Sequence, residues 1–336
     1  MRAMVVTKPG GALSFEDRTV PKPGRGQVRI KVHACGVCHS DMFVHDALWP
    51  GLALPRVPGH EVSGVVEEIG EGVTGLWPGQ RVGVGWYGGH CGTCSACRSG
   101  DAMLCETGPV TGISHDGGYQ ESMLAPADAV AMLPEGMAFD EAAPLLCAGV
   151  TTYNALRNSP ARPGDLVAVQ GLGGLGHLGV QFARAMGFRV AAVSGGSDKE
   201  KFARKLGAHL YVDSRAGDPA AALQKHGGAS VILATAPDGP SISRLVPGLG
   251  RNGCLVVVGA PMEPIQLSAI DLISGRRRVQ GWPAGTAQDS TETMAFAALH
   301  GVKTMIETFP LRKADEAYAR MIGGKARFRA VLVTEG

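Results

Sequence analysis

The stretch Leu166-Val-Ala-Val-Gln-Gly-Leu-Gly-Gly-Leu-Gly176 decides the fold of this chain. Residues 166–169 form a short apolar run that is typical of a buried strand, and apolar residues recur at helical spacing after the glycines. Between the two lies the pattern G-x-G-x-x-G, with glycines at positions 171, 173 and 176. A strand, this turn and a helix in that order are typical of a dinucleotide-binding domain.

Each glycine of this turn has a physical reason. Gly171 permits the tight turn, Gly173 lets the backbone approach a pyrophosphate, and Gly176 lets helix and strand pack closely. The phosphates would then lie at the helix N-terminus, where free N–H groups and the helix dipole favour negative charge. The residues that we expect to bind NAD or NADP in this loop are Gly171, Gly173, Gly174, Leu175 and Gly176.

Strand and helix patterns alternate on the C-terminal side of this loop. The expected strands lie at residues 189–193, 209–212, 231–233 and 255–258. Such alternation predicts right-handed crossovers and a doubly wound parallel sheet, the Rossmann arrangement. Up to about residue 150, by contrast, apolar runs are short and turns are frequent, so a β-rich, partly barrel-like domain is expected there. The predicted fold class is therefore α/β.

The end of the second expected strand bears on the choice between NAD and NADP. An acidic residue about 20 positions after the glycine turn ordinarily binds the ribose hydroxyls of NAD. That position is Ser194 here, Asp198 lies too far along, and Lys199 offers a positive charge to a 2′-phosphate. No arginine follows directly, although arginine is the better phosphate clamp. We favour NADP, with the use of both cofactors as the alternative.

Four cysteines lie close together in the pattern Cys91-x2-Cys94-x2-Cys97-x7-Cys105. Four thiolates suit a closed, tetrahedral zinc site, and the intervening residues are small or flexible, as a chain that wraps an ion requires. An iron–sulfur cluster is the competing interpretation, because its loops also use this spacing. In a reducing compartment such a group of cysteines favours a metal over disulfides.

A second constellation comprises Cys35-Gly-Val-Cys38-His39-Ser40-Asp41 and Gly59-His60-Glu61. A thiolate, an imidazole and a nearby carboxylate are the ligand types of a catalytic zinc with an open coordination position. Asp41 and Glu61 are candidates for orienting the ligands and tuning their charge. Cys35 continues an expected strand, so we interpret it as a small buried residue rather than as half of a redox pair with Cys38.

Composition argues against several classes of function for this chain. The 336 residues carry a formal net charge of +2 and no basic block, so nucleic-acid binding is not expected. No apolar run approaches the length that spans a bilayer, and the first residues lack the pattern of a signal peptide. We expect a cytoplasmic enzyme that acts on a small molecule.

Together these motifs resemble the zinc-dependent alcohol dehydrogenases of the medium-chain dehydrogenase/reductase superfamily. The resemblance covers essentially the whole chain, and the motifs occur in the family's order. They are Cys-Gly-Val-Cys-His-Ser-Asp at 35–41, Gly-His-Glu at 59–61, the four-cysteine lobe at 91–105, Pro-Leu-Leu-Cys-Ala-Gly-Val-Thr-Thr-Tyr at 144–153 and the glycine turn at 171–176. The resemblance implies a GroES-like catalytic domain formed by residues 1–150 and 285–336, with a Rossmann domain at 151–284 between its two parts.

The resemblance also implies the ligands of two zinc ions per chain. Those of the catalytic zinc would be Cys38, His60 and Cys147, with Glu61 beside the metal. Cys147 enters only through the resemblance, because its spacing from the other ligands carries no signal. The four-cysteine lobe would hold the second, structural zinc.

Further roles are implied for residues around the reacting groups. Ser40 would take the alcohol proton, His39 would lie close to the pyrophosphate, Thr151 would contact the nicotinamide and Arg329 would lie near the cofactor phosphates. Many members of the family carry a histidine three residues after the relay hydroxyl, where this chain has Phe43. Whether His45 completes the outer proton relay is therefore open.

The tryptophans and the length of the chain suggest a pocket and an assembly. Trp49 and Trp86 match positions where bulky aromatic residues narrow the family's substrate cleft, and Trp282 follows the last Rossmann strand. Packing in the core is the alternative for each of the three. The short chain resembles compact microbial members, which are commonly tetramers, so a homo-oligomer (a tetramer or a dimer) is expected.

The sequence thus predicts an enzyme that interconverts small, mainly primary alcohols and aldehydes by hydride transfer to or from NAD(P). An NADPH-dependent aldehyde reductase of the cinnamyl-alcohol-dehydrogenase type is the alternative within enzymes. A non-catalytic dinucleotide-binding protein is the alternative of another class, and loss of Cys38, His60 or Ser40 would indicate it. All three residues are present.

Overall fold

A computed structural model describes residues 1–334 of the chain. Contacts divide the chain into two compact units. Unit 1 comprises Met1–Val150, Gly285–Leu299 and the chain from Lys303 onward, and unit 2 comprises Thr151–Ala284 and His300–Val302. Unit 1 is therefore assembled from both ends of the sequence, whereas unit 2 is almost continuous.

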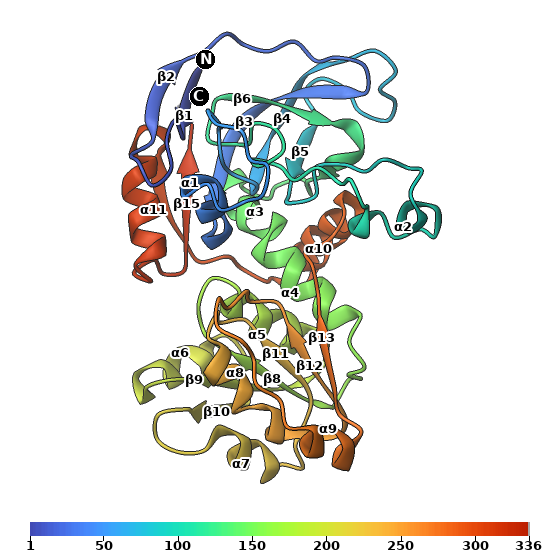
Figure 1. Ribbon diagram of the computed structural model, residues 1–336, viewed down its shortest axis with the longest axis vertical. Helices are drawn as coiled ribbons and strands as arrows, with labels where there is room; N and C mark the ends of the chain where they lie inside the picture. Colours follow the sequence, from blue (N-terminus) through green and yellow to red (C-terminus); the bar gives the residue numbers. More distant parts are fainter. Residues whose placement is uncertain (335–336) are drawn as a thin grey trace. The chain divides into compact units, whose positions relative to one another are not determined.

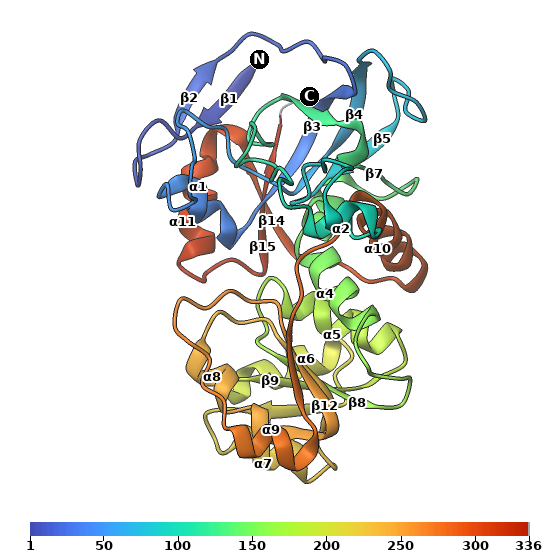
Figure 2. The same cartoon turned by 45° about the vertical axis from the view of Figure 1, so that its right-hand side comes forward.

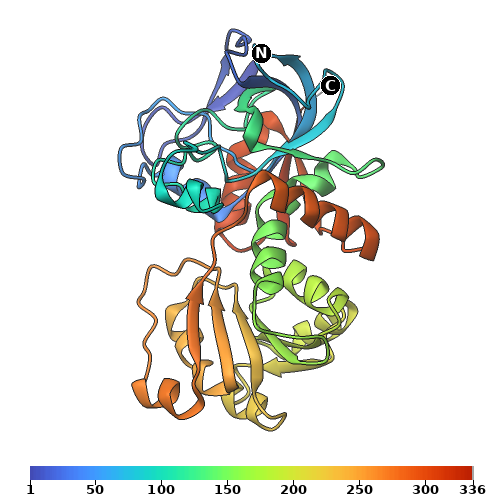
Figure 3. The ribbon, with the colours of Figure 1, turned by 90° about the vertical axis from the view of Figure 1, so that its right-hand side faces the viewer.

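Unit 2 is built on a sheet of six strands that all run parallel. In chain order they are β8 (Leu166–Gln170), β9 (Arg189–Ser194), β10 (Leu210–Asp213), β11 (Ala229–Ala234), β12 (Leu249–Val257) and β13 (Arg278–Gly281). Across the sheet the order is β10-β9-β8-β11-β12-β13, so the first strand is central and the order reverses beside it. This is the doubly wound order of a Rossmann domain, which confirms the predicted fold class. Figure 3 shows β13, in orange, at the outer margin of the sheet.

Short helices connect these strands. They are α5 (Gly176–Ala185), α6 (Glu200–Lys205), α7 (Pro219–Gln224), α8 (Gly239–Ser243) and α9 (Ala269–Gly275), and α4 (Ala148–Arg157) precedes them. Helix α5 packs on β8 and β9 and buries Leu178 and Phe182, two of the apolar residues whose spacing predicts it. Helices α7 and α8 begin at Asp218 and Asp238, whose carboxylates accept hydrogen bonds from backbone N–H groups of the first turn.

Unit 1 contains a sheet of seven strands and a separate pair, β1 (Arg2–Val5) with β2 (Ser14–Asp17). The seven strands are β3 (Gln27–Val37), β4 (Val62–Ile69), β5 (Arg81–Val84), β6 (Ser122–Pro126), β7 (Val130–Met132), β14 (Ile306–Pro310) and β15 (Arg329–Val333). Residues of β3 alternate between half-buried and buried from Gln27 to Ala34, as a strand with one solvated face requires. Beyond Ala34 every residue of the strand is buried, and the strand ends directly before Cys38.

The C-terminal segment completes this sheet. The strand order is β14-β15-β3-β4-β5-β7, so β15 lies between β14 and the long N-terminal strand β3. The remaining helices of unit 1 are α1 (Met42–His45), α2 (Ser95–Arg98), α3 (Phe139–Ala142), α10 (Ala287–His300) and α11 (Ala314–Ile322). Helices α1 and α11 lie side by side although they are far apart in the sequence (Figures 1 and 2), and the ring of His45 stacks on that of Tyr318 with centroids 4.4 Å apart. Within residues 1–334, no helix is both long enough and apolar enough to span a bilayer.

Candidate functional sites

Four side chains from distant parts of unit 1 meet in one group. Cys38 follows the end of β3, His60 and Glu61 directly precede β4, and Cys147 follows a short 3-10 helix. Their potential ligand atoms all lie within 4.8 Å of one another, and the sulfurs of Cys38 and Cys147 are 3.8 Å apart. Two sulfurs bound tetrahedrally to zinc at about 2.3 Å each would be about 3.8 Å apart. The donor set and its spacing therefore fit a zinc ion.

The pKa shifts of Cys38 and His60 also indicate that this place favours a positive charge. A hydrogen bond from the thiol of Cys147 lowers the pKa of Cys38 well below its usual value, although burial opposes this shift. Burial alone would lower the pKa of His60, but the charges of Asp41 and Cys38 outweigh it and raise that pKa to about 10. Negative charge on Cys38 and Asp41 is thus concentrated in a buried place, where a divalent cation would be strongly favoured.

The imidazole of His60 is held in one orientation. Its Nδ1 lies 3.2 Å from Oδ1 of Asp41, and its Nε2 is buried without a hydrogen-bond partner among the residues that the structure describes. Oδ2 of Asp41 accepts hydrogen bonds from the backbone N–H of Cys38, at 2.8 Å, and from the hydroxyl of Tyr119, at 2.9 Å. A carboxylate on one nitrogen and an unpartnered second nitrogen are typical of a metal-binding histidine.

Glu61 forms a buried ion pair with Arg329. Glu61 is fully buried and Arg329, the first residue of β15, is 4% exposed. The second carboxylate oxygen of Glu61 has no partner in the described part of the chain, and a Cβ on Gly36 would collide with it. Arg329 thus lies beside the metal group, and its predicted contact with the cofactor phosphates stays a prediction.

Aromatic side chains lie against this group. The ring of Trp86 stands edge-on to that of His60, with centroids 4.9 Å apart and an interplanar angle of 88°. Trp49 lies 5.9 Å from Trp86, and Phe43 lies 5.7 Å from Trp49, also as edge contacts. Of the two predicted pocket tryptophans of unit 1, Trp86 therefore contacts a candidate zinc ligand, and Trp49 packs behind it against Trp86. Trp282 belongs to unit 2, where its backbone N–H donates to the carbonyl of Val257.

The predicted proton-transfer residues lie just after Cys38. His39 is exposed and Ser40 is half-buried, both in a 3-10 helix spanning His39–Asp41. Nδ1 of His45 contacts Asp46 at 2.6 Å, so that nitrogen is engaged with a carboxylate rather than with Ser40. Within residues 1–334, the structure thus adds no contact that would make His45 the outer relay left open by the sequence.

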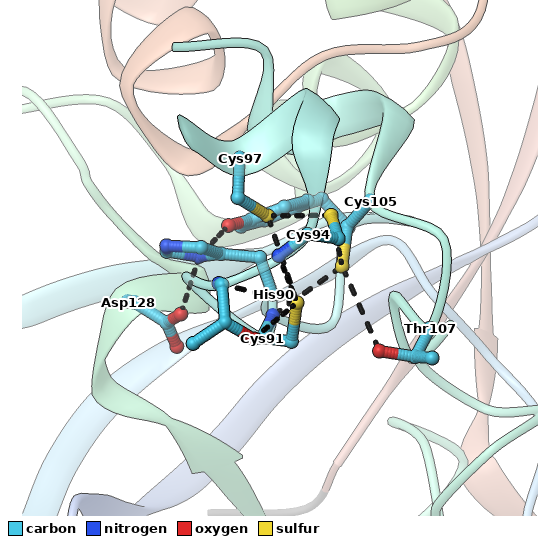
Figure 4. A network of polar contacts seen from close by, with 9 residues as sticks. His90, Cys91, Cys94, Cys97, Cys105, Thr107 and Asp128 are labelled. Atoms are coloured by element: carbon cyan, nitrogen blue, oxygen red, sulfur yellow. Dashed lines mark hydrogen bonds and ion pairs between the residues drawn. The ribbon is translucent and has the colours of Figure 1, made fainter. Parts of the chain in front are cut away.

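The four-cysteine lobe forms a second group, which Figure 4 shows with its sulfurs turned toward one another. The sulfurs of Cys94 and Cys97 are 3.4 Å apart, and Cys91–Cys97 and Cys94–Cys105 are each 4.0 Å apart. A hydrogen bond from the Thr93 hydroxyl, joined by backbone N–H groups, lowers the pKa of Cys91 to about 5, whereas desolvation and the Cys94 sulfur raise that of Cys97 to about 12. Four thiolates this close repel one another, so full ionisation requires a cation. A closed zinc site satisfies this need.

The glycine turn of unit 2 has the geometry that its sequence predicts. Gly171 has φ +91°, in the region that favours glycine, and a Cβ on Gly176 would collide with the carbonyl oxygen of Gly171. Gly173 is exposed, and a Cβ there would meet no atom within 4 Å. The space above Gly173 is therefore open to a ligand, while Gly176 serves the packing of helix α5.

The end of β9 gathers more positive charge than the sequence predicts. Nζ of Lys199 lies 3.4 Å from Oγ of Ser194, which ends β9. The side chain of Arg215 covers Gly195, where a Cβ would come within 2.8 Å of its Nε. The sequence analysis missed Arg215 because this residue follows β10, about twenty positions after Ser194. Only the pairing of β10 with β9 brings the two close together. The signal is the strand register: Asp213 pairs with Ser194, so the residues after Asp213 come beside Gly195.

Two family models match the chain. The model described as "Alcohol dehydrogenase GroES-like domain" matches residues 24–135, and that described as "Zinc-binding dehydrogenase" matches residues 174–299. The alcohol dehydrogenase patD of Penicillium expansum is 46% identical over 328 residues, which cover 98% of this chain and 96% of the relative.

Solved structures resemble the chain over almost all of its length. A cinnamyl alcohol dehydrogenase from Sorghum bicolor has a TM-score of 0.90 and 35% identity, covering 99% of this chain and 97% of that one. The CAD from Helicobacter pylori, solved as a complex with NADP(H), has a TM-score of 0.88 and 29% identity, with coverage of 99% and 97%.

Substitutions in the glycine turn should separate binding from packing. Gly173→Ala is expected to leave the thermal midpoint unchanged and to weaken dinucleotide binding roughly tenfold, because the methyl group stands where the pyrophosphate approaches. Gly176→Ala is expected to lower the free energy of unfolding by about 1–3 kcal/mol, because its methyl group collides with backbone. Calorimetric titration with NADH and NADPH, together with chemical denaturation, measures both. Equal effects of the two variants on stability would contradict this assignment.

Proposed function

The chain belongs to the zinc-type medium-chain dehydrogenase/reductase family, and we propose that it is a zinc-dependent alcohol dehydrogenase acting on small, mainly primary alcohols and aldehydes with NAD(P). The observation that carries this proposal is the group of buried Cys38 and His60 with half-buried Cys147, whose donor atoms suit zinc. The group lies beside an aromatic wall, in a chain whose other unit bears a dinucleotide loop. A non-catalytic binding protein would have no need of these three ligands.

The proposed chemistry divides between the bound groups and the chain. Cys38, His60 and Cys147 would hold a zinc ion, which would supply Lewis acidity that favours loss of the alcohol proton, and a bound nicotinamide would supply the hydride acceptor. Ser40, two residues after Cys38, is the hydroxyl that receives the alcohol proton. In aldehyde reduction the same hydroxyl returns a proton to the substrate oxygen.

Other residues hold the reactants in place. We assign His39 to the pyrophosphate side of the site and Thr151 to the nicotinamide, and we keep Arg329 near the cofactor phosphates. The ion pair with Arg329 also balances the charge of Glu61, which is buried beside the metal ligands.

Aromatic residues support the preference for primary alcohols. Trp49 and Trp86 form a bulky wall next to His60, so a second substituent on the carbinol carbon has little room. Trp282, after β13, is proposed as a further wall of the pocket. The likeness to the Sorghum bicolor enzyme supports an aldehyde reductase of the cinnamyl-alcohol-dehydrogenase type as the second candidate. That enzyme class would use the same residues in the opposite direction.

For the cofactor we favour NADP, with the use of both dinucleotides as the alternative. Ser194 carries no charge that would repel a 2′-phosphate, and Lys199 and Arg215 bring two cations to the same loop. Asp213 and Asp198 moderate this charge. Asp213, however, is engaged by the backbone N–H groups of Gly196 and Arg215, both at 2.9 Å.

A homo-oligomer and a cytoplasmic location complete the proposal. All four residues of β13 are exposed, and this edge strand offers unpaired backbone groups to a second copy across a two-fold axis. Ile270 and Ile273 of the neighbouring helix α9 are 74% and 77% exposed, which suits an apolar interface. A single-chain mass in sedimentation would refute the oligomer.

The proposed cytoplasmic location agrees with the cysteines. All eight are unpaired, as a reducing compartment would keep them.

The metal groups should separate into one that is catalytic and one that is structural. Cys38→Ala is expected to lower turnover by more than roughly 100-fold with dinucleotide binding retained, because a ligand of the reactive zinc is lost. Cys97→Ser is expected chiefly to lower the thermal midpoint, because a closed site has no position for substrate. Elemental analysis should give two zinc ions per wild-type chain. Iron with sulfide, or normal turnover of Cys38→Ala, would refute the zinc mechanism.

Removing an aromatic wall should change selectivity. Trp86→Ala is expected to reduce the preference for primary over secondary alcohols, measured as a ratio of kcat/KM values, by roughly tenfold. Trp77→Ala is the matched control, because Trp77 is 59% exposed. Initial rates over a panel of alcohols and aldehydes with both cofactors measure this. An unchanged ratio in Trp86→Ala would exclude Trp86 from the pocket.

The cofactor assignment depends on the charge at the end of β9. Ser194→Asp is expected to shift the ratio of dissociation constants toward NADH by roughly tenfold or more, since a carboxylate binds ribose hydroxyls and repels phosphate. Arg215→Ala is expected to weaken binding of 2′,5′-ADP without affecting that of 5′-AMP. A wild type that already prefers NADH strongly, and that Ser194→Asp leaves unchanged, would show that Ser194 does not face the ribose.

A further inference from the structure

Tyr119 is a buried tyrosine outside the motifs that predict the metal sites. It is 1% exposed, and its hydroxyl donates to Oδ2 of Asp41 at 2.9 Å. Burial raises its pKa well above the usual value, and the neighbouring Asp41 adds to this shift. The hydroxyl therefore keeps its proton at neutral pH and acts only as a donor toward Asp41.

Asp41 links this hydroxyl to two candidate zinc ligands. One oxygen accepts from Tyr119 and from the backbone N–H of Cys38, and the other faces Nδ1 of His60 at 3.2 Å. Asp41 is 3% exposed, so water has little access to it. A buried carboxylate held by fixed donors keeps one orientation, and it passes that orientation to the imidazole.

The position of Tyr119 is itself fixed relative to His60. Its backbone N–H donates to Pro58 at 3.0 Å, and the N–H of Gly118 donates to Gly59 at 2.9 Å, so this segment pairs with the residues directly before His60. The ring of Tyr119 fills the space that a Cβ on Gly59 would need, and Gly59 has φ +101°. The backbone pairing and the ring therefore register the hydroxyl against the peptide that carries His60.

We propose that Tyr119 is a positioning residue, which holds the His60 imidazole in its zinc-binding orientation through Asp41. This inference rests on the proposed zinc site. Nδ1 of His60 is directed at Asp41, which leaves Nε2 toward the sulfurs of Cys38 and Cys147. Without the hydroxyl, Asp41 loses one of its two donors on Oδ2 and can turn, so the imidazole is less well directed before zinc binds.

The test is the affinity of each zinc site, measured as zinc retained per chain against increasing chelator concentration. Each zinc site should lose its ion in a separate step of this titration. The step that is absent in Cys38→Ala belongs to the site of Cys38, His60 and Cys147. Tyr119→Phe keeps the ring over Gly59 and removes only the hydroxyl. This variant is expected to weaken zinc binding at the Cys38 site by roughly 10-fold or more, within the range found when a hydrogen-bond partner of a metal ligand is removed. The step of the four-cysteine lobe should not move.

Tyr87→Phe is the matched control. Tyr87 is also buried, and its hydroxyl contacts His90 in the neighbourhood of the four-cysteine lobe rather than Asp41. This variant is expected to leave the Cys38 step in place. A general loss of stability would move both steps in Tyr119→Phe, and it would overturn a specific positioning role.

A double-mutant cycle tests whether Tyr119 acts through Asp41. Asp41→Asn should weaken the same step, and adding Tyr119→Phe to it should cause little further loss, because the two residues act in series. Additive losses would overturn the proposed route.

If Tyr119→Phe fails to fold, unchanged zinc affinity in Asp41→Asn would overturn it instead. Wild-type zinc at the Cys38 site with unchanged affinity in Tyr119→Phe would refute the role of Tyr119 alone, whereas no zinc at that site in the wild type would refute the proposed function as well.

Discussion

The buried negative charge around Cys38 is the constraint on which the rest of unit 1 depends. A thiolate and the carboxylates of Asp41 and Glu61 lie together, each 5% exposed or less, and such charges are costly away from water unless they are compensated. Without a metal, the chain itself supplies the compensation, from Arg329 beside Glu61 and from a protonated His60 beside Asp41. These two residues come from opposite ends of unit 1, so the long strand β3, the start of β4 and the C-terminal strand β15 must all meet at one place. A divalent cation bound by Cys38 and His60 would take the place of the His60 proton, so metal binding here would release a proton.

The two candidate metal groups differ in burial. Of the ligands near Cys38, Cys38 and His60 are buried and the ring of Trp86 covers one side of His60, so electrostatic effects on a bound ion would be stronger there than at the surface. The four cysteines near α2 are exposed or half-buried. The sulfurs of Cys91 and Cys105 accept hydrogen bonds from backbone N–H groups of their own loop. Its two short helices bury none of their residues, so a bound ion rather than a core would keep the shape of this lobe.

Local patterns predict what depends on neighbours in sequence. The glycine turn and the alternation of strands and helices predict unit 2, because each βαβ unit is encoded within a short segment. The strands expected at 189–193 and 209–212 agree with β9 and β10, and Cys35 is buried in β3 as expected. Contacts between distant segments carry no such signal. Cys147 lies 109 positions from Cys38 and enters only through resemblance to a family, while Arg215 and Tyr119 reach their partners through strand register and loop packing.

The place of β15 has a consequence for how the chain matures. This strand lies between β14 and β3, and its first residue, Arg329, is the ion-pair partner of Glu61. During synthesis, unit 2 leaves the ribosome as an almost continuous segment, before the last strand of unit 1 exists. Until then β3 has an open edge and Glu61 lacks its cation. The N-terminal part of unit 1 therefore completes its sheet, and pairs its buried Glu61, only after unit 2 has been synthesised.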